Sequence, residues 1–425
     1  LKDVLGLKNG QKVEVNLTIT PKSLEFILKK VNNKKLSKQE IDEIIKDVVN
    51  NSLSEAEIAM FVSGMYKNGM DFNETINLIK SILNHGKKLN LKNKFIVDKH
   101  SIGGIPGNRT TPIIVSICAS AGLIMPKTSS RAITSAAGTA DVIETIARVD
   151  FSMEELEKIV QKTNACMVWA EGVGMVPADS KIIQIEKMLD IDPESQLLAS
   201  IMSKKLAVGS KYILIDIPCG KTAKVLKNRG EKLKKKFERI GKYFKLKLKV
   251  VLTEGNHPIG CGVGPVLEMR DIIKILNPKL EGPKDLENKS IYLAGQLLEM
   301  TGKAKKNQGE KLAREILYSG RAFEKFKQII KAQKGNADKK LKFAKFHKNI
   351  LSNRNGTIRE IDNKKINLLA RIAGAPADKS AGLYLCKKIN EDVKKGENIL
   401  IIYSESKSRL NQAVKFYKLQ KPVRL

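Results

Sequence analysis

The sequence has few of the residues that build metal centres and disulfide frameworks. Its 425 residues include five cysteines, an odd number without CxxC spacing, and four histidines, none of which pair at metal-ligand spacing. Scattered thiols of this kind are typical of reduced, mostly buried cysteines, so we expect a cytoplasmic protein. A structural or catalytic zinc site is not expected, and no metal is predicted.

Long apolar runs are also missing. No segment reaches the roughly 18 uninterrupted apolar residues that a membrane span needs, and no signal peptide is visible, so no membrane association is expected. The chain begins at Leu1 rather than at a methionine, and we expect a fragment trimmed at both ends. Residues 1–20 are interpreted as the remnant of an N-terminal β domain.

Acidic residues are scarce relative to basic ones. There are 45 Asp and Glu against 77 Lys and Arg, which gives a net charge of +32. Such a surplus suits nucleic acid, but it also suits a protein that handles anionic metabolites. The densest basic run, residues 227–249, alternates with apolar residues as an amphipathic helix and strand do, and no series of aromatic residues for base stacking accompanies it. A solvated surface is therefore favoured, and a nucleic-acid-binding protein is the alternative from another class.

The periodicity of the remaining chain predicts an α/β protein of three units. Residues 21–90 are helical, with Ser37 and Glu40 forming a capping box and Ser54 preceding another helix. From residue 95 to about residue 276, apolar strands alternate with helices, which predicts a parallel sheet. Residues 336–425 carry short strands and turn residues typical of a small β-rich or α+β domain. With 42% hydrophobic residues, each unit can bury a core.

The first candidate site is the stretch DKHSIGGIPGNRTTP, residues 98–112. It follows a predicted strand at residues 94–97 and precedes a helix with Thr111 as its N-cap and Pro112 at its first position. Glycines and a helix N-terminus together favour an anion, most often phosphate. The spacing matches neither the P-loop nor the dinucleotide-binding motif. A plain turn before a capped helix would give the same pattern, and this loop alone does not separate the two interpretations.

A second loop, residues 127–145, repeats this design. It follows the strand LIMP and carries hydroxyl groups, a guanidinium and small residues, and Thr139 is predicted to cap the next helix. The polar residues are Ser129, Ser130, Arg131, Thr134, Ser135 and Thr139. Because parallel strands present their carboxyl ends at one edge of a sheet, we expect the two loops to lie together.

Three further segments carry candidate chemistry. In DPESQLLASIMSKKLAVG, Asp192 is a natural N-cap before Pro193, and Ser200 and Lys204 lie one turn apart on one helix face. In IDIPCGKTAK, a strand ends beside Lys221 and Lys224, which can reach a phosphate or can be ordinary surface lysines. The glycine loop of residues 255–265 precedes a helix opened by proline and has an equally good structural explanation.

These motifs together resemble a known family. DKHSIGG, SSRAITS with GTAD, LLASIMSKKLA and AGAPADKSAG are similar to the class II nucleoside phosphorylases, which include thymidine and pyrimidine nucleoside phosphorylases. The match runs from about residue 21 to the end and is closest to the archaeal members that act on AMP. The resemblance implies a helical domain of residues 21–90 completed by about 178–209, an α/β phosphate-binding domain of 91–177 and 210–335, and a C-terminal domain of 336–425. It also implies a homodimer or higher homo-oligomer.

The resemblance assigns roles residue by residue. Asp192 matches the family's proton donor. Lys99, Ser101, Thr111, Ser129 and Thr139 match phosphate-binding positions, and Ser200 and Lys204 match base-side positions. The positions that match AMP contacts in the archaeal members are Gly104, Ser130, Arg131, Ala132, Ile133, Thr134, Ser135, Thr139, Ser200 and Lys224. The loop SIGGIPGNRTT is one residue longer than in the pyrimidine members.

The implied activity is the glycosyltransferase reaction that splits AMP with inorganic phosphate as co-substrate, giving adenine and ribose 1,5-bisphosphate without a cofactor. Pyrimidine members carry an arginine for the base carbonyl fifteen residues before the serine that matches Ser200, and Ile185 stands there in this chain. A pyrimidine nucleoside phosphorylase is therefore the disfavoured alternative. We expect AMP and phosphate as partners, and neither nucleic acid nor a membrane.

Overall fold

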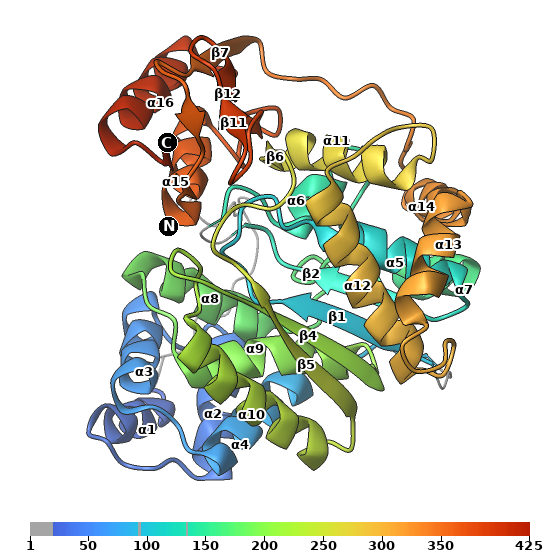
Figure 1. Cartoon of the computed structure of the whole chain (residues 1–425). Helices are drawn as coiled ribbons and strands as arrows, with labels where there is room; N and C mark the ends of the chain where they lie inside the picture. The colour runs from blue at the N-terminus through green and yellow to red at the C-terminus, as the bar shows by residue number, and fades with distance from the viewer. Residues whose placement is uncertain (1–19, 92–94, 133–134) are drawn as a thin grey trace, which may run out of the picture.

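The computed structural model describes residues 20–91, 95–132 and 135–425, so the interpretation of residues 1–20 as a β-domain remnant lies almost wholly outside the described residues. Figure 1 shows three groups of elements: helices in blue and green at the bottom, a sheet with covering helices in the middle, and a C-terminal group in orange and red at the top. This is the predicted fold class, a mixed α/β protein with a helical group and a small C-terminal group.

The helical group is built from two separated segments. Its helices are α1 (Ser23–Val31), α2 (Lys38–Val49), α3 (Glu55–Asn68), α4 (Phe72–Asn84), α8 (Pro177–Leu189) and α9 (Glu194–Ala207). Helices α8 and α9 pack against α3 and α4, respectively. The predicted capping box of Ser37 with Glu40 is present, and Ser54 caps α3 with Glu57 in the same way. These caps hold the helices that present α8 and α9 to the sheet edge.

The sheet is parallel, as predicted. Its strands are β1 (Val97–Ser101), β2 (Met125–Ser129), β3 (Ala165–Trp169), β4 (Tyr212–Cys219) and β5 (Lys247–Glu254). Strand β1 pairs with β4, β4 pairs with β5, and β2 pairs with β3, all in parallel. A parallel bridge between Ile96 and Ile124 joins the two sets. All five strands therefore end at one edge.

Helices bury both faces of this sheet, which explains its nearly continuous apolar strands. They are α5 (Thr110–Ser120), α6 (Thr139–Ile143), α7 (Met153–Thr163), α10 (Lys227–Tyr243), α11 (Pro265–Leu276), α12 (Lys284–Met300), α13 (Gly309–Tyr318) and α14 (Arg321–Ala332). Along β4, Ile213 and Ile215 face the core shared with the helical group, and Leu214 faces the core of α5 and α12. No helix in the described part of the chain is long and apolar enough to cross a membrane.

The C-terminal group is a small antiparallel sheet with two helices. Its elements are β7 (Phe346–Leu351), β8 (Gly356–Thr357), β9 (Glu360–Ile361), α15 (Asn363–Ala373), β10 (Gly382–Leu385), β11 (Asp392–Val393), β12 (Asn398–Ser404), α16 (Lys407–Gln420) and β13 (Val423–Arg424). The main sheet has the order β6-β10-β12-β7, and β6 (Gly262–Val263) comes from the glycine loop of residues 255–265. That loop thus ties the C-terminal group to the α/β part.

Four predicted boundaries were wrong by one to three residues. Strand β1 begins at Val97, so Lys99 and Ser101 lie in the strand rather than in a loop. Helix α5 begins at Thr110 with Arg109 as its N-cap, because the Thr110 hydroxyl is held by Lys99. Pro112 still falls in the first turn, where helical N–H groups have no partner within the helix. Helix α6 begins at Thr139 and is capped by Gly138, and Pro193 rather than Asp192 caps α9.

Candidate active site

The first loop brings a buried lysine to the N-terminus of α5. Lys99 is 1% exposed, and its Nζ donates a hydrogen bond to Thr110 Oγ1 at 2.6 Å. Two residues along β1, Ser101 Oγ donates to Asp216 Oδ2 at 2.6 Å. Asp216 is itself buried and is paired with Lys289 of α12 at 3.2 Å. The strand end and the helix start therefore form one polar cluster.

Cations dominate this cluster. Burial lowers the pKa of Lys99 from its usual value to about 7; Asp216 opposes this shift, and Lys289 and Lys127 add to it. The same surroundings push the pKa of His100 well below its ordinary value, because desolvation and nearby lysines disfavour a charged ring. A dianion placed here would restore the charge of Lys99 and offset the repulsion, so the site is suited to phosphate.

The second loop begins at the end of β2, beside the first. Ser129 Oγ is buried and has no hydrogen-bond partner among the described residues. Ser130 and Ala132 are partly buried beside it, the Ala132 N–H donates to Asp141 Oδ2 at 2.8 Å, and Ser135 Oγ donates to the Ala137 carbonyl at 2.9 Å. The predicted residues Ile133 and Thr134 lie outside the described residues.

Arg131 is engaged by acidic groups rather than presented to a ligand. Its guanidinium donates to both carboxylate oxygens of Glu144, at 2.6 and 2.8 Å, and to Asp141 at 3.2 Å. The hydrogen bond from Arg131 lowers the pKa of Glu144 to about 2. The guanidinium also lies over the Trp169 ring, 4.7 Å from its centroid. In this geometry Arg131 shapes the second loop.

Arg109 joins the two loops, a role that the sequence patterns did not suggest. As the N-cap of α5 it donates to Thr139 Oγ1 at 2.9 Å and to the Ala137 carbonyl at 2.6 Å. Its Nε donates to Glu268 of α11 at 2.7 Å. Thr139 and Thr111 are both 8% exposed. The guanidinium thereby fixes the start of α6 against the start of α5.

Ser200 and Lys204 meet as predicted, around an acid that the sequence analysis missed. Lys204 Nζ donates to Ser200 Oγ at 2.9 Å. Asp179 of α8 is fully buried, accepts a hydrogen bond from Ser200 Oγ at 3.1 Å and pairs with Lys204. Asp179 follows directly after the Pro-Ala start of α8, where an acid is expected to serve the helix dipole alone, so its position carried no functional signal.

Asp192 faces the loop after β4 instead of its own helix. Its Oδ2 lies 2.8 Å from Lys224 Nζ, and both side chains are about one-third exposed. Glu186, on α8, is the second missed acid: its Oε1 is buried without a partner among the described residues. Burial and the nearby Asp192 raise the pKa of Glu186 to about 8. The ion pair of Asp192 with Lys224 thus connects the helical group to the loop after β4.

The first loop also touches the loop that carries Lys224. Gly104 has φ +105°, and a Cβ added there would lie 3.0 Å from Lys224 Cβ. A side chain at residue 104 would therefore strain the backbone and displace Lys224. The predicted residues outside positions 133 and 134 thus lie at the carboxyl edge of the sheet, between α8 and α9, and along α9.

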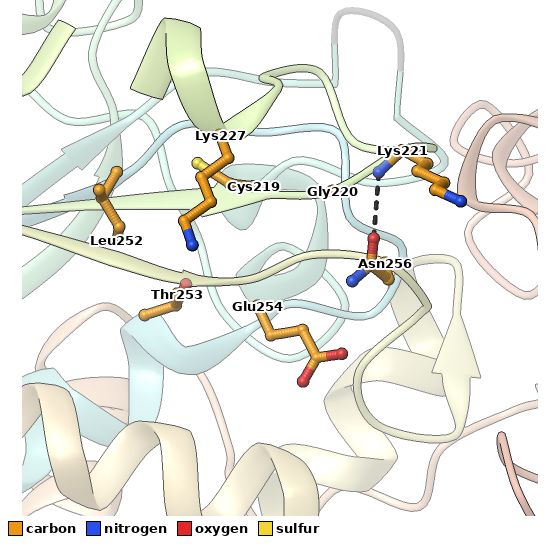
Figure 2. A pocket seen from close by; sticks show the side chains of 8 residues that line it. All are labelled: Cys219, Gly220, Lys221, Lys227, Leu252, Thr253, Glu254 and Asn256. Carbon is orange, nitrogen blue, oxygen red and sulfur yellow. Dashed lines mark hydrogen bonds between the residues drawn. The ribbon is translucent and has the colours of Figure 1, made fainter. Parts of the chain in front are cut away.

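A cavity of about 430 Å³ lies at the carboxyl ends of β4 and β5, beside the start of α10. It is lined by Cys219, Gly220, Lys221, Lys227, Leu252, Thr253, Glu254 and Asn256, as Figure 2 shows. The Lys221 N–H donates to Asn256 Oδ1 at 3.0 Å, and the Lys221 side chain points away from Lys227 (Figure 2). Of the candidate residues, Lys221 lines this cavity, whereas the residues at the ends of β1 and β2 and on α9 do not, so we place the candidate site with the latter.

Family descriptions match all three groups. Residues 24–86 match the glycosyl transferase family helical bundle domain, residues 93–323 match its a/b domain, and residues 357–421 match the pyrimidine nucleoside phosphorylase C-terminal domain. The fold alone is shared with anthranilate phosphoribosyltransferase from Thermus thermophilus, with a TM-score of 0.60 and 16% identity over 73% of this chain and 99% of that one. The fold and the polar sheet edge therefore define a glycosyl transferase with a phosphorylase C-terminal domain.

Relatives that match along nearly the whole chain identify the family within this class. The chain is 44% identical to AMP phosphorylase from Methanococcus vannielii, over 99% of this chain and 84% of the relative. It is 45% identical to AMP phosphorylase from Pyrococcus abyssi, over 100% of this chain and 85% of the relative. The chain belongs to the AMP phosphorylase family.

Proposed function

We propose that this chain catalyses the phosphorolysis of AMP, in which AMP and inorganic phosphate give adenine and ribose 1,5-bisphosphate. The observation that carries the proposal is the cationic cluster at the sheet edge, where the desolvated Lys99 stands beside Ser101, Ser129 and the N-terminus of α5. The names of the full-length relatives support the same substrates. The predicted homodimer and cytoplasmic location stay predictions.

At the phosphate end, the chain's own groups hold the nucleophile. In the proposed complex, Lys99 and the α5 N–H groups neutralise phosphate, and Ser129 Oγ gains the hydrogen-bond partner that it lacks among the described residues. A phosphate oxygen forms a bond to the anomeric carbon as the bond to the base nitrogen breaks. Holding phosphate against the sugar converts a bimolecular encounter into an oriented step.

At the base end, the electron pair of the broken bond stays on adenine. Asp192 donates a proton to a ring nitrogen as the base leaves, which avoids an unstable anion. Ser200 and Lys204, held by Asp179, lie on the base side of the site in this proposal. The proposed steps require no metal or organic cofactor.

The position that carries arginine in pyrimidine members argues for a purine base. Ile185 is 3% exposed and packs in the core of the helical group. An isoleucine has no N–H to donate to a pyrimidine carbonyl, so the contact expected in a pyrimidine enzyme cannot form. The neighbouring Glu186 is a carboxyl group whose pKa of about 8 keeps a proton on it near neutral pH, and it can both donate and accept.

Release of free base tests this proposal directly. The protein is incubated with phosphate and, separately, with AMP, CMP, UMP, adenosine and thymidine, and the bases are separated by chromatography. We expect adenine from AMP, in amounts that match the ribose 1,5-bisphosphate formed, and none without phosphate. Thymine from thymidine at a higher rate would instead select the pyrimidine activity. Salt-sensitive binding of RNA or DNA with no base release would select the nucleic-acid alternative.

Substitutions at Lys99 and Ser129 should weaken the binding of phosphate far more than the binding of AMP. Lys99→Met keeps the buried volume and removes the charge, and Ser129→Ala removes a hydroxyl that bonds to none of the described residues. We expect the phosphate KM to rise about tenfold for each variant, since a hydrogen bond to a charged group contributes roughly 1.5 kcal/mol. Thr128→Val, one residue before Ser129, is the matched control and should leave both KM values unchanged. A rise in the KM for AMP alone would show that Lys99 and Ser129 bind the 5′-phosphate of AMP and not inorganic phosphate.

A further inference from the structure

Two asparagines of α15 reach out of the C-terminal group into the site. Asn363 and Asn367 are one helical turn apart, so they lie on one face of α15, and they are 0% and 6% exposed. Their side-chain amides contact backbone or hydroxyl groups of the α/β part, although the rest of the buried face of α15 packs in its own apolar core. Buried amides that cross between two groups of elements are costly unless their hydrogen bonds are made.

Asn367 joins the first loop to the second. Its Nδ2 donates to the Gly104 carbonyl at 3.1 Å, and its Oδ1 accepts from the Ala136 N–H at 3.1 Å. One amide therefore uses its donor for one substrate loop and its acceptor for the other. Gly104 in turn packs against Lys224, so the position of the Gly104 carbonyl limits where Lys224 can lie.

Asn363 holds the third substrate loop, which lies between β4 and α10 and carries Lys224. Its Nδ2 donates to Thr222 Oγ1 at 2.9 Å and to the Gly255 carbonyl at 2.8 Å. Thr222 stands two residues before Lys224, and its hydroxyl continues the network by donating to the Asn256 carbonyl at 3.0 Å. The two asparagines thus fix the segment that carries Lys224 from both sides, through Gly104 and through Thr222.

We propose that Asn363 and Asn367 are positioning residues: α15 sets the relative positions of the three substrate loops and so aims Lys224 at the 5′-phosphate. We call the hydrogen bonds of Asn363 and Asn367 to the three loops the brace. The assignment of the 5′-phosphate rests on the proposed function, whereas the brace rests on these hydrogen bonds alone. Neither asparagine touches the reacting atoms in this proposal. The C-terminal group is then a component of the substrate site and more than a covering domain.

Asparagine-to-aspartate variants test the brace, because a carboxylate keeps the size of the amide but cannot donate. Asn367→Asp loses the bond to the Gly104 carbonyl and repels it, and Asn363→Asp loses the bond to the Gly255 carbonyl and can no longer donate to Thr222. Leu369→Ala is the matched control, since Leu369 is buried in the C-terminal core on the same helix. It should lower the unfolding temperature without touching the loops.

Hydrogen exchange is the first measurement, and it needs no activity. In Asn367→Asp and Asn363→Asp we expect faster exchange in peptides that cover residues 102–109, 135–138 and 220–226, relative to Leu369→Ala. Unchanged exchange in these peptides would overturn the brace.

The second measurement is kcat/KM for AMP and for adenosine. We expect about a tenfold loss with AMP and less than about twofold with adenosine, because misplacing a binding group by a fraction of an ångström is enough for such losses. If the asparagines have only a structural role, kcat/KM falls equally for both substrates. That result would overturn the proposal that they position Lys224. Faster exchange together with a wild type that releases no adenine would leave the brace standing and show that the proposed function is wrong.

Discussion

Replacing Asp192 with asparagine should reduce kcat for AMP by about 10²- to 10⁴-fold, the range that a positioned general acid contributes. The side chain of asparagine has nearly the same shape but no proton of suitable acidity. Because the neutral amide would no longer attract Lys224, the lysine would stay available to the substrate, and we expect the KM for AMP to change by less than about threefold. Steady-state kinetics with saturating phosphate measures both parameters.

Loss of a helix cap cannot explain the expected effect of Asp192→Asn. Pro193 caps α9, and the Asp192 carboxylate faces Lys224, so the substitution takes away no helix cap. Asp190→Asn is the matched control: Asp190 is exposed, it ends α8 in a left-handed conformation with φ 52°, and asparagine adopts that conformation readily. It should leave kcat and stability unchanged.

Adenosine separates the two roles that Asp192 can have. If Asp192 is the acid, the variant loses the same factor with adenosine as with AMP, because both substrates release adenine. If Asp192 only holds Lys224, the loss is confined to AMP, since adenosine has no 5′-phosphate. Near-normal turnover of both substrates would contradict any catalytic role.

The sequence predicted the elements well because their signals are local. The capping box at Ser37 and the apolar run of β4 depend on neighbouring residues alone, and the structure confirms them. The pairing of Ser200 with Lys204 was also predictable, because residues four apart share a helix face. Parallel strands then bring both phosphate loops to one edge.

What could not be predicted depends on contacts between distant segments. The N-cap assigned to Asp192 was wrong because its carboxylate pairs with Lys224, which lies 32 residues further along the chain. The ion pairs of Arg131 with Glu144 and Asp141 could not be predicted either. No periodicity reports that Asn367 would meet Gly104, 263 residues away. Such contacts follow from tertiary packing, which overrides local propensity.

If Lys224 binds the 5′-phosphate, as proposed, AMP should be at least about a hundredfold better than adenosine in kcat/KM. A lysine paired with a dianion at a partly buried site contributes a few kcal/mol, and each ~1.4 kcal/mol is about tenfold. Arg131, which also matches an AMP-contact position, is held by two hydrogen bonds to Glu144, whereas Lys224 has a single ion pair with the partly exposed Asp192, so Lys224 is the better candidate. Initial rates of adenine release at limiting substrate measure the ratio.

Lys224→Ala should then collapse this ratio, mainly by slowing AMP. In the free protein Lys224 is paired with Asp192. In the proposed complex Lys224 binds the 5′-phosphate of AMP instead, so the loss of its ammonium group slows AMP. Adenosine has no phosphate for Lys224 to bind, and its turnover should therefore be unchanged when Lys224 is removed.

Lys221→Ala is the control for this variant, because Lys221 lies on the same loop and its exposed side chain points away from the Lys227 side of the loop (Figure 2). It keeps the loop's backbone bond to Asn256 and should preserve the AMP preference. The decisive quantity is the ratio of the two kcat/KM values rather than either alone, since a partly unfolded preparation lowers both together. Equal losses on AMP and adenosine in Lys224→Ala, or equal efficiencies in the wild type, would show that the site does not read the 5′-phosphate. A loss confined to AMP would assign Lys224 to that phosphate.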